Sequence, residues 1–315
     1  MRTKVAMIGV GCISGIYLEN IFTRYPEIEL VGVCDLIRAR AEAAKEKYPS
    51  LLIYETMEDA FRDPQVEVIL NLTRPAEHFE VSRAALAAGK HVYSEKPLAA
   101  TAELGRQLVA LAEKNGLYLG GAPDTFLGAG FQTARRLIDA GAIGTVVGAS
   151  AHMIGHGPES WHPDPEFFYK FGGGPMMDMG PYYITALVNL MGRVTETVSM
   201  AKASFPTRTI TAKERFGETI QVDVNTYADG LMRFESGAVA RMFATFDAWY
   251  PQASGMDIYG SEGTLFAPDP NTFGGAITAG LVNVGTAGVF TDYRFIPRER
   301  QAENLEGTVT GTVSG

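Results

Sequence analysis

The sequence predicts an α/β chain: a doubly wound parallel sheet, then an α+β domain with a large, mostly antiparallel sheet. Three observations support this prediction. Strand and helix patterns alternate through residues 1–122 with short connections, which is typical of a parallel sheet. The first strand ends in a glycine-rich turn. Beyond residue 122, β-rich stretches follow one another with turn signals between them. We therefore expect two domains, residues 1–122 and 123–315.

The elements of the first domain follow from local patterns. Residues 66–72 carry few polar side chains, as expected for a strand buried on both faces. Residues 76–89 form an amphipathic pattern that stops at a glycine, and Thr101 is the expected N-cap of the next helix. The expected strands are 4–8, 30–34, 51–54, 66–72, 90–94 and 117–121. The expected helices are 15–24, 37–48, 56–62, 77–88 and 101–115.

The second domain begins differently and becomes β-rich. We expect a helix at 131–140, a strand at 145–153 and a Gly-, Pro- and His-rich loop at 155–165. A helix at 176–191 follows a run of three glycines. The expected strands are 194–203, 219–234, 238–248, 255–260 and 263–267, and the Gly/Ala/Thr-rich stretch 274–288 is expected to be a long loop. One face of this sheet would be available for a ligand or another subunit.

Composition limits the classes of function. Of 315 residues, 46% are hydrophobic and 20% charged, which is ordinary for a globular protein. The net charge of −9 argues against a nucleic-acid partner or an anionic membrane. The two cysteines, Cys12 and Cys34, cannot build a disulfide framework or a Cys-rich metal site, which suits a cytoplasmic location. We expect no signal peptide and no membrane span, because the first strand begins near residue 3 and no long apolar run occurs.

The turn after the first strand predicts a phosphate site. The strand stops at Gly9, Gly11 follows two residues later, and a helical pattern begins near Ser14. Glycines let bare backbone amides approach a phosphate, and the N–H groups at the helix N-terminus favour the anion. The third position of this fingerprint is usually Gly or Ala; here it is Ser14, a mild departure because serine is small enough for close helix–strand packing. Cys12 and Ile13 complete the expected phosphate turn.

The second strand ends at Asp35, which lies 26 residues after Gly9. This is close to the spacing of about 20 residues expected for the acid that holds a ribose diol. Asp35 could equally cap the next helix, and the two roles are compatible. The complete unit predicts a Rossmann dinucleotide-binding fold. A carboxylate here favours NAD, while Arg38 and Arg40 leave NADP as the alternative because arginines can clamp a phosphate.

The strand at 90–94 ends in the sequence Glu95-Lys96-Pro97. Ligands of a doubly wound sheet bind outside the carboxyl ends of its strands, so Lys96 is placed where the reactive end of a cofactor should lie. The alternative is a solvated surface lysine.

Together these motifs resemble the Gfo/Idh/MocA oxidoreductases, which include glucose–fructose oxidoreductase and inositol dehydrogenase. The resemblance covers nearly the whole chain. It rests on Gly9-Val-Gly11-Cys-Ile-Ser14, Asp35, Glu95-Lys96-Pro97 and Gly172-Gly-Gly-Pro-Met-Met-Asp178-Met-Gly-Pro-Tyr182. It implies NAD(P)-dependent hydride transfer involving a hydroxyl-bearing carbon of a sugar, a sugar derivative or a cyclitol. By analogy, it also suggests a homodimer or homotetramer formed through the C-terminal sheet.

The resemblance assigns three catalytic residues. Lys96 would contact the nicotinamide and the reacting hydroxyl, Asp178 matches the family's aspartate, and Tyr182 matches its general acid/base. Asp178 and Tyr182 are four residues apart on an expected helix, so they should share a face. A nearby Lys96 would lower the pKa of Tyr182 toward working pH. The alternative is a helix-capping Asp178 and a core Tyr182, with the adjacent Tyr183 as a control.

Two further segments are expected to contact ligands. Residues 73–78 resemble the family loop along the cofactor, and its expected contacts are Thr73, Arg74, Pro75 and His78. His78 could orient this loop or simply cap the following helix. The loop containing His156, Trp161 and His162 is the candidate for substrate recognition, since Trp161 offers a flat apolar surface to a sugar ring. Asp124 could add a hydroxyl contact. The histidine spacing matches no zinc motif, so no metal is expected.

Two other functions remain as alternatives. One is a redox-neutral glycosidase or epimerase that retains its nicotinamide. The other is a non-catalytic protein that senses a dinucleotide or a sugar. The chain ends in a polar stretch, residues 303–315, earlier than the resemblance implies. Either the terminus is naturally short or the protein is truncated.

Overall fold

The computed structural model describes residues 2–250, 254–283 and 286–293. The chain divides into two compact units, Met1–Ala122 and Pro123–Gly315. Within the described ranges, no helix is both long enough and apolar enough to cross a bilayer. The polar end expected at 303–315 lies outside these ranges.

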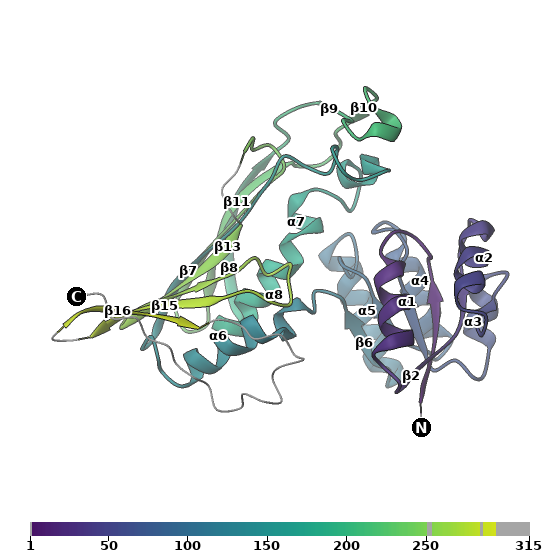
Figure 1. Cartoon of the computed structure of the whole chain (residues 1–315), viewed down its shortest axis with the longest axis horizontal. Helices are drawn as coiled ribbons and strands as arrows, with labels where there is room; N and C mark the ends of the chain where they lie inside the picture. Colours follow the sequence, from purple (N-terminus) through teal and green to yellow (C-terminus); the bar gives the residue numbers. More distant parts are fainter. Residues whose placement is uncertain (1, 251–253, 284–285, 294–315) are drawn as a thin grey trace. The chain divides into compact units, whose positions relative to one another are not determined.

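The first unit contains a six-stranded sheet in the order β3-β2-β1-β4-β5-β6, in which neighbouring strands pair in parallel. Strands and helices alternate along the chain (Figure 1). The strands are β1 (Thr3–Ile8), β2 (Ile28–Cys34), β3 (Leu52–Ile53), β4 (Val68–Asn71), β5 (His91–Ser94) and β6 (Leu119–Gly121). The helices are α1 (Ser14–Thr23), α2 (Arg38–Lys47), α3 (Met57–Arg62), α4 (His78–Ala87) and α5 (Ala102–Asn115). These elements agree with the sequence prediction to within a few residues.

The first unit has a hydrophobic core on each face of its sheet. Along β1, Val5 and Met7 join one cluster, while Ala6 and Ile8 join the other, as the two-residue period of a strand requires. Helices α1 and α2 contribute to the first cluster, and α3, α4 and α5 contribute to the second. The buried runs of β1 and β2 are therefore almost wholly apolar.

The second unit contains an eight-stranded sheet in the order β16-β15-β14-β13-β7-β12-β11-β8. Its pairings are antiparallel except for β12 with β7. The strands are β7 (Val146–Ile154), β8 (Val194–Lys202), β11 (Tyr227–Phe234), β12 (Val239–Thr245), β13 (Gly255–Gly260), β14 (Gly263–Ala267), β15 (Ile277–Asn283) and β16 (Thr286–Tyr293). A separate pair consists of β9 (Thr207–Thr209) and β10 (Thr219–Gln221).

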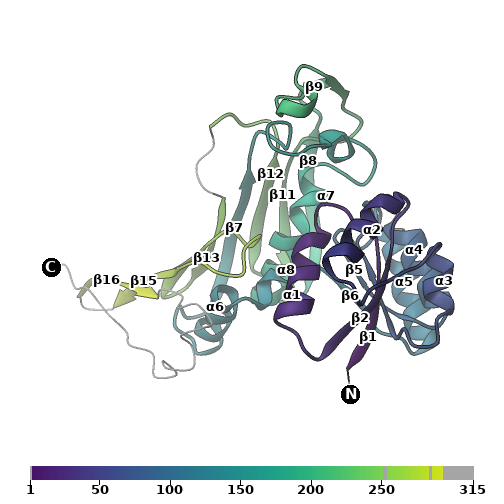
Figure 2. The ribbon, with the colours of Figure 1, turned by 45° about the vertical axis from the view of Figure 1, so that its right-hand side comes forward.

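Helices cover one face of the large sheet. In Figures 1 and 2, α6 (Ala129–Asp139) and α8 (Gly180–Met191) lie on the same side of it. Tyr183 and Leu187 of α8 pack into one core cluster with Met242 and Ile258 of the sheet. The short elements are α7 (Pro175–Asp178), η1 (Thr125–Leu127), η2 (Pro165–Tyr169) and η3 (Lys213–Arg215).

The structure corrects three predictions in the second unit. The helix expected at 176–191 is two helices, α7 and α8, which meet at Met179. The strand expected at 219–234 is interrupted between β10 and β11, where Asp223 bonds to the backbone of Tyr169 instead of continuing the ladder. The expected loop at 274–288 contains β15 and the start of β16, because β15 completes a ladder with β14 despite its small residues.

Candidate functional site

The carboxyl ends of four neighbouring strands bring the predicted cofactor residues of the first unit to one edge. Gly9 follows β1, Asp35 follows β2, Thr73 comes shortly after β4, and Glu95-Lys96 follows β5. Strand order reverses between β1 and β4, which is the switch point where doubly wound sheets bind ligands. Topology alone therefore gathers residues that are up to 87 positions apart in the sequence, the separation of Gly9 from Lys96.

The two glycines of the phosphate turn have different physical roles. Gly9 has φ +95°, and an added Cβ would lie 2.6 Å from the carbonyl oxygen of Leu72. This glycine lets β1 and the end of β4 approach closely. At Gly11, an added Cβ meets no described heavy atom within 4 Å. Open space at Gly11 is what a bound phosphate requires, so the protein's own packing does not explain this glycine.

Helix α1 begins in a form suited to an anion. Ser14 is buried and donates its hydroxyl to the Gly11 carbonyl at 2.7 Å. Within the described chain, no side chain caps this helix and no acidic residue occupies its first turn. Cys12 and Ile13, both exposed, lie directly before the helix. The helix N-terminus thus retains the positive partial charge that favours a phosphate.

Asp35 connects the phosphate turn to the start of α2. Its Oδ2 accepts the Val10 amide at 2.6 Å, and its Oδ1 accepts the Ile37 amide at 2.7 Å. Arg40 Nη1 lies 3.9 Å from Oδ1. A carboxylate has about four lone-pair sites, so these bonds leave acceptor capacity for a ribose diol. Asp35 therefore fits the role of ribose acceptor. It does not cap α2, because the N-cap residue is Ile37 and no described side chain caps this helix.

Arg38, the predicted phosphate clamp of the NADP alternative, is bound to carboxylates. It pairs with Glu42 at 2.9 Å and also with Glu55, on the exposed surface of α2. The hydrogen bonds that Arg38 donates to Glu55 and Glu42 raise the pKa of Arg38. A 2′-phosphate would have to displace these carboxylates, so this arrangement favours NAD.

A buried network fixes the loops after β4 and β5. Asn71 accepts the Thr73 hydroxyl at 2.6 Å and donates to the His78 carbonyl at 3.0 Å. The His78 ring is buried, with Nδ1 2.6 Å from the Pro97 carbonyl oxygen and Nε2 2.9 Å from the Thr73 carbonyl oxygen. His78 therefore orients the loop by hydrogen bonding. Arg74 is exposed and Pro75 half-buried within the same loop.

Glu95 holds the backbone of Lys96. Its Oε2 accepts the Lys96 amide at 3.0 Å, and its Oε1 accepts the Tyr17 hydroxyl from α1 at 2.8 Å. Glu95 is only 9% exposed, whereas Lys96 is half-buried. Asn71 and Tyr17 were missed in the sequence. Asn71 could have been identified as a single amide side chain in an otherwise apolar strand. Nothing in the pattern of α1 distinguishes Tyr17.

The glycine run before α7 allows a close backbone approach in the second unit. At Gly173, an added Cβ would lie 2.5 Å from the Phe168 carbonyl oxygen, and at Gly174 it would lie 2.7 Å from that of Asn225. Asp178 ends α7 and Tyr182 lies in the first turn of α8. Both side chains are half-buried. The break at Met179 separates them, so they do not lie on one continuous helix as the spacing predicted.

Tyr183 differs sharply from its neighbour Tyr182. It is fully buried and donates its hydroxyl to Asp269 at 2.8 Å. Burial, and next the charge of Asp269, raises the pKa of Tyr183. A buried phenol bonded to a carboxylate is a poor general base, so Tyr183 remains the control.

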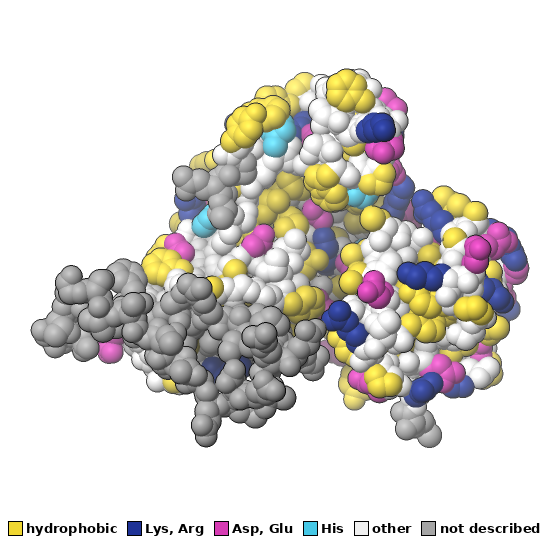
Figure 3. All heavy atoms as spheres, in the orientation of Figure 1, with side chains coloured by type: hydrophobic (Ala, Val, Ile, Leu, Met, Phe, Trp, Pro, Cys, Tyr) yellow, Lys and Arg dark blue, Asp and Glu magenta, His cyan; other side chains and the backbone are white. Residues whose placement is uncertain are grey.

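The predicted recognition loop carries exposed and stacked aromatic rings. Trp161 is 66% exposed and packs edge-on against His162, with centroids 5.4 Å apart. The His156 ring stacks on Trp249 at 3.4 Å between centroids. Hydrophobic side chains are exposed at the end of the second unit that carries β9 and β10 (Figure 3). Asp124 is half-buried just before η1. Among described residues, no group of three potential ligands could hold a metal ion.

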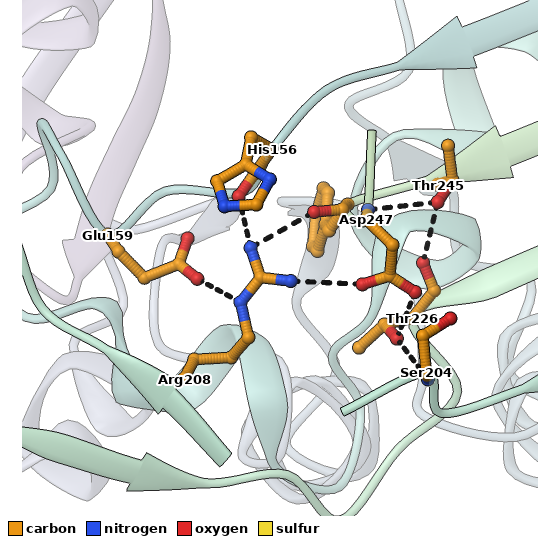
Figure 4. Close-up of polar contacts among 8 residues, drawn as sticks. His156, Glu159, Ser204, Arg208, Thr226, Thr245 and Asp247 are labelled. Carbon is orange, nitrogen blue, oxygen red and sulfur yellow. Dashed lines mark hydrogen bonds and ion pairs between the residues drawn. The ribbon is translucent and has the colours of Figure 1, made fainter. Parts of the chain in front are cut away.

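A buried ion cluster underlies this loop, and sequence reasoning missed it. Arg208 of β9 pairs with Glu159 of the loop and, at 3.0 Å, with Asp247 after β12. The three side chains are 4–7% exposed. Figure 4 shows the two carboxylates on opposite sides of the guanidinium, with His156 beside it. Burial, and next the charge of Arg208, lowers the pKa of His156.

Comparison with known families identifies both units. Residues 3–121 match the oxidoreductase family with an NAD-binding Rossmann fold, GFO_IDH_MocA. Residues 131–266 match the GFO/IDH/MocA C-terminal domain. The open turn at Gly11, the uncapped α1 and the carboxylate of Asp35 fit the pyrophosphate and ribose of NAD.

Individual relatives agree with this assignment. Inositol 2-dehydrogenase from Salmonella typhimurium is 32% identical over 46% of this chain and 44% of its own length. Myo-inositol 2-dehydrogenase from Thermotoga maritima is 25% identical over 84% and 75%. The matches to the first of the curated relatives span about half of those proteins' length.

Solved structures share the fold. An NAD-binding oxidoreductase from Klebsiella pneumoniae has a TM-score of 0.81 at 22% identity, covering 100% of this chain and 86% of its own. Levoglucosan dehydrogenase in complex with NADH and levoglucosan has a TM-score of 0.81 at 19% identity, with the same coverage of 100% and 86%.

Proposed function

Because both units match it, the chain belongs to the Gfo/Idh/MocA family of oxidoreductases, and we propose that it transfers a hydride between NAD and a hydroxyl-bearing carbon of a sugar, a sugar derivative or a cyclitol. The observation that carries the proposal is the gathering of the phosphate turn, Asp35 and Lys96 at the switch point of one parallel sheet. That edge is where a dinucleotide binds in this architecture.

In this proposal the first unit holds the cofactor. The amides of the turn at Gly11 and of α1 bind the pyrophosphate, and Asp35 accepts the ribose hydroxyls. The loop carrying Thr73 and His78 lines the cofactor. When bound, NAD supplies the acceptor or donor of the hydride. Lys96, fixed through its amide by Glu95, presents its ammonium group to the reacting hydroxyl.

The second unit supplies the proton chemistry and the recognition of substrate. In the oxidative direction Tyr182 takes the hydroxyl proton, and the Lys96 ammonium stabilises the negative charge that develops on oxygen. Asp178 acts with Tyr182 and Lys96 in this proton transfer. Trp161 lies against a sugar face, and His156, His162 and Asp124 provide hydrogen bonds.

A substrate panel tests the proposal. Purified protein with NAD is mixed with myo-inositol, levoglucosan and common hexoses, while the absorbance of reduced nicotinamide is followed. We expect at least one compound to be oxidised, and Tyr182→Phe to lower its turnover about 10²-fold or more. The matched control is Tyr183→Phe, which should retain turnover. A folded protein that oxidises none of the panel, or purifies with cofactor and shows no net reduction, would support the redox-neutral alternative.

We also propose that two copies associate through the open face of the large sheet. On this face, Val198, Met200, Leu231 and Phe266 are 39–85% exposed. Met232 follows Leu231 on the other face of β11, and Leu265 and Ala267 flank Phe266 on the other face of β14; all three belong to the core. A second copy would cover this apolar surface, as at other permanent interfaces. Light scattering after size exclusion should report a dimer or tetramer, and Met200→Glu should shift it toward the monomer. A wild-type monomer would reject this proposal.

A further inference from the structure

We propose that Arg208 is a positioning residue for substrate recognition: it holds the loop at 155–165 in the conformation that presents His156 and Trp161. The inference rests on the proposed function. Arg208 lies on β9, outside this loop and more than 40 residues beyond it in sequence. Its guanidinium reaches back to the loop and also to the end of β12, so it ties together three separate parts of the second unit.

From β9, the guanidinium directs its donors to the other two parts, the loop and the end of β12. Nε donates to Glu159, and Nη2 donates to the carbonyl of His156, both in the loop. Nη1 donates to Asp247 at 3.0 Å, and Nη2 also donates to the Phe246 carbonyl at 3.1 Å. The rigid fork of an arginine can serve these acceptors together, which a lysine cannot. Figure 4 shows this arrangement.

The far side of the cluster is itself held in place. The other oxygen of Asp247 accepts the Thr226 hydroxyl at 2.7 Å, and the Asp247 amide donates to the Thr245 hydroxyl at 2.9 Å. Thr226 also accepts the Ser204 amide at 3.2 Å. Asp247 is thus fixed to the sheet. Because Arg208 binds both Asp247 and Glu159, it fixes the loop relative to the sheet.

The loop closes on the cluster only because residue 157 is glycine. Gly157 has φ +90°, and an added Cβ would lie 2.2 Å from the Tyr169 hydroxyl and 2.3 Å from Glu159 Oε2. Two residues after Glu159, Trp161 donates its amide to Pro158 at 3.2 Å. The backbone that carries Trp161 is therefore one short turn from the carboxylate that Arg208 holds.

The charges of the cluster argue for a positional role. Two carboxylates share one cation in a buried site, and Glu159 Oε2 has no hydrogen-bond partner among described residues. Apolar side chains commonly stabilise such a site as well as a buried ion pair does. What the ion pair adds is directional: it fixes the loop residues His156 and Glu159 relative to Asp247 at the end of β12.

The chain has two tryptophans, Trp161 and Trp249, and both report on this region. Trp161 lies on the loop, and Trp249 stacks on His156. In a Trp249→Phe background, the emission anisotropy of Trp161 measures how firmly the loop is held. This readout needs neither substrate nor cofactor.

The test compares Arg208→Lys, Arg208→Met and Glu159→Gln with Arg83→Lys. Arg83 is the control, because it pairs with Glu80 on the exposed surface of α4 in the first unit, outside both the proposed site and the proposed association face. For a substrate found in the panel, we expect Arg208→Lys to raise KM roughly tenfold and to leave kcat and the NADH dissociation constant within about twofold. The Trp161 anisotropy should fall in Arg208→Lys, fall further in Arg208→Met and stay constant in Arg83→Lys.

Unchanged KM and anisotropy in Arg208→Lys would overturn the inference. A fall in kcat with KM unchanged in Arg208→Lys would also overturn it, because such a result indicates an effect on the chemical step and not on the position of the loop. If Arg208→Met fails to fold, Arg208→Lys and Glu159→Gln decide by the same readouts. If wild-type protein oxidises no compound of the panel, the proposed dehydrogenase fails, and the anisotropy series still accepts or rejects the role of Arg208 in holding Trp161.

Discussion

The two units hold their candidate site residues by different physical means. In the first unit, parallel-sheet topology gathers the strand ends, and Asp35, His78 and Glu95 then bond to backbone groups of nearby loops. In the second unit, β7 leads into only one end of the recognition loop. Buried ion pairs and hydrogen bonds from Arg208 hold the loop residues His156 and Glu159 in place. Lys96 of the first unit can therefore be replaced at little cost in stability. In the second unit, by contrast, replacing a charged residue of the buried cluster should lower stability and disturb the recognition loop.

The largest effect is expected from Lys96→Ala. Turnover should fall about 10²- to 10⁴-fold, because the ammonium that supports proton transfer is lost. The melting temperature and the NAD dissociation constant should hardly change, since Glu95 holds the backbone through the amide of residue 96. Steady-state kinetics and fluorescence titration with NAD measure both. Turnover equal to that of wild type would remove Lys96 from the mechanism.

Arg208→Met should produce the largest loss of stability. It leaves Glu159 and Asp247 buried without their cation, which costs about 3–5 kcal/mol of unfolding free energy. The exposed Arg83→Met, in the first unit, is the control, with a loss of about 1 kcal/mol or less. Urea unfolding measures both. Equal losses in the two variants would abolish the proposed difference between the units.

The two turn glycines should separate structure from binding within the first unit. Gly9→Ala forces a side chain onto the Leu72 carbonyl at a left-handed φ, and should cost about 1–3 kcal/mol of stability. Gly11→Ala meets no described atom, so stability should stay within about 0.5 kcal/mol. Its NAD affinity should fall roughly tenfold, because the methyl group faces the phosphate. Thermal unfolding and NAD titration of both variants check this, and an unaltered affinity in Gly11→Ala would contradict the phosphate assignment.

The smallest effect concerns pH. Burial and the charge of Arg208 outweigh the carboxylates of Glu159 and Asp247 and lower the pKa of His156. The unfolded chain therefore binds the proton first as pH falls, so stability is lost below about pH 6.5 and is unaffected above it. His156→Gln should remove this part of the pH dependence. Urea unfolding near pH 7.5 and pH 5.5 measures it, and an identical slope in both proteins would refute it.

The first unit could be predicted closely from sequence because its signals are local. Each strand is an apolar run with a polar residue at its end, and parallel topology determines where those ends meet. The sequence therefore predicts that Gly9, Asp35 and Lys96 lie at one edge of the sheet. The sequence could not reveal Tyr17, whose hydroxyl reaches Glu95 across 78 residues.

The second unit was predicted less completely because its contacts are distant in sequence. Arg208 finds its partners 38 to 52 residues away, and nothing in the alternating segment around β9 distinguishes it. The stretch containing β15 was expected to be a loop because its small residues favour turns, yet pairing with β14 makes it a strand. The sequence also did not predict the break at Met179. Gly180 and Pro181, which follow it, occupy the first turn of α8, where glycine and proline are tolerated.

The most direct test of the central claim is a crystal structure with NAD and an oxidised or oxidisable substrate bound. We predict that Lys96 Nζ and the Tyr182 hydroxyl lie about 2.6–3.2 Å from the reacting hydroxyl oxygen. The Asp178 carboxylate should lie within the same distance of that oxygen or of one of these two groups. A complex in which any of the three points away from the nicotinamide, with the substrate hydroxyl held by other groups, would contradict the account.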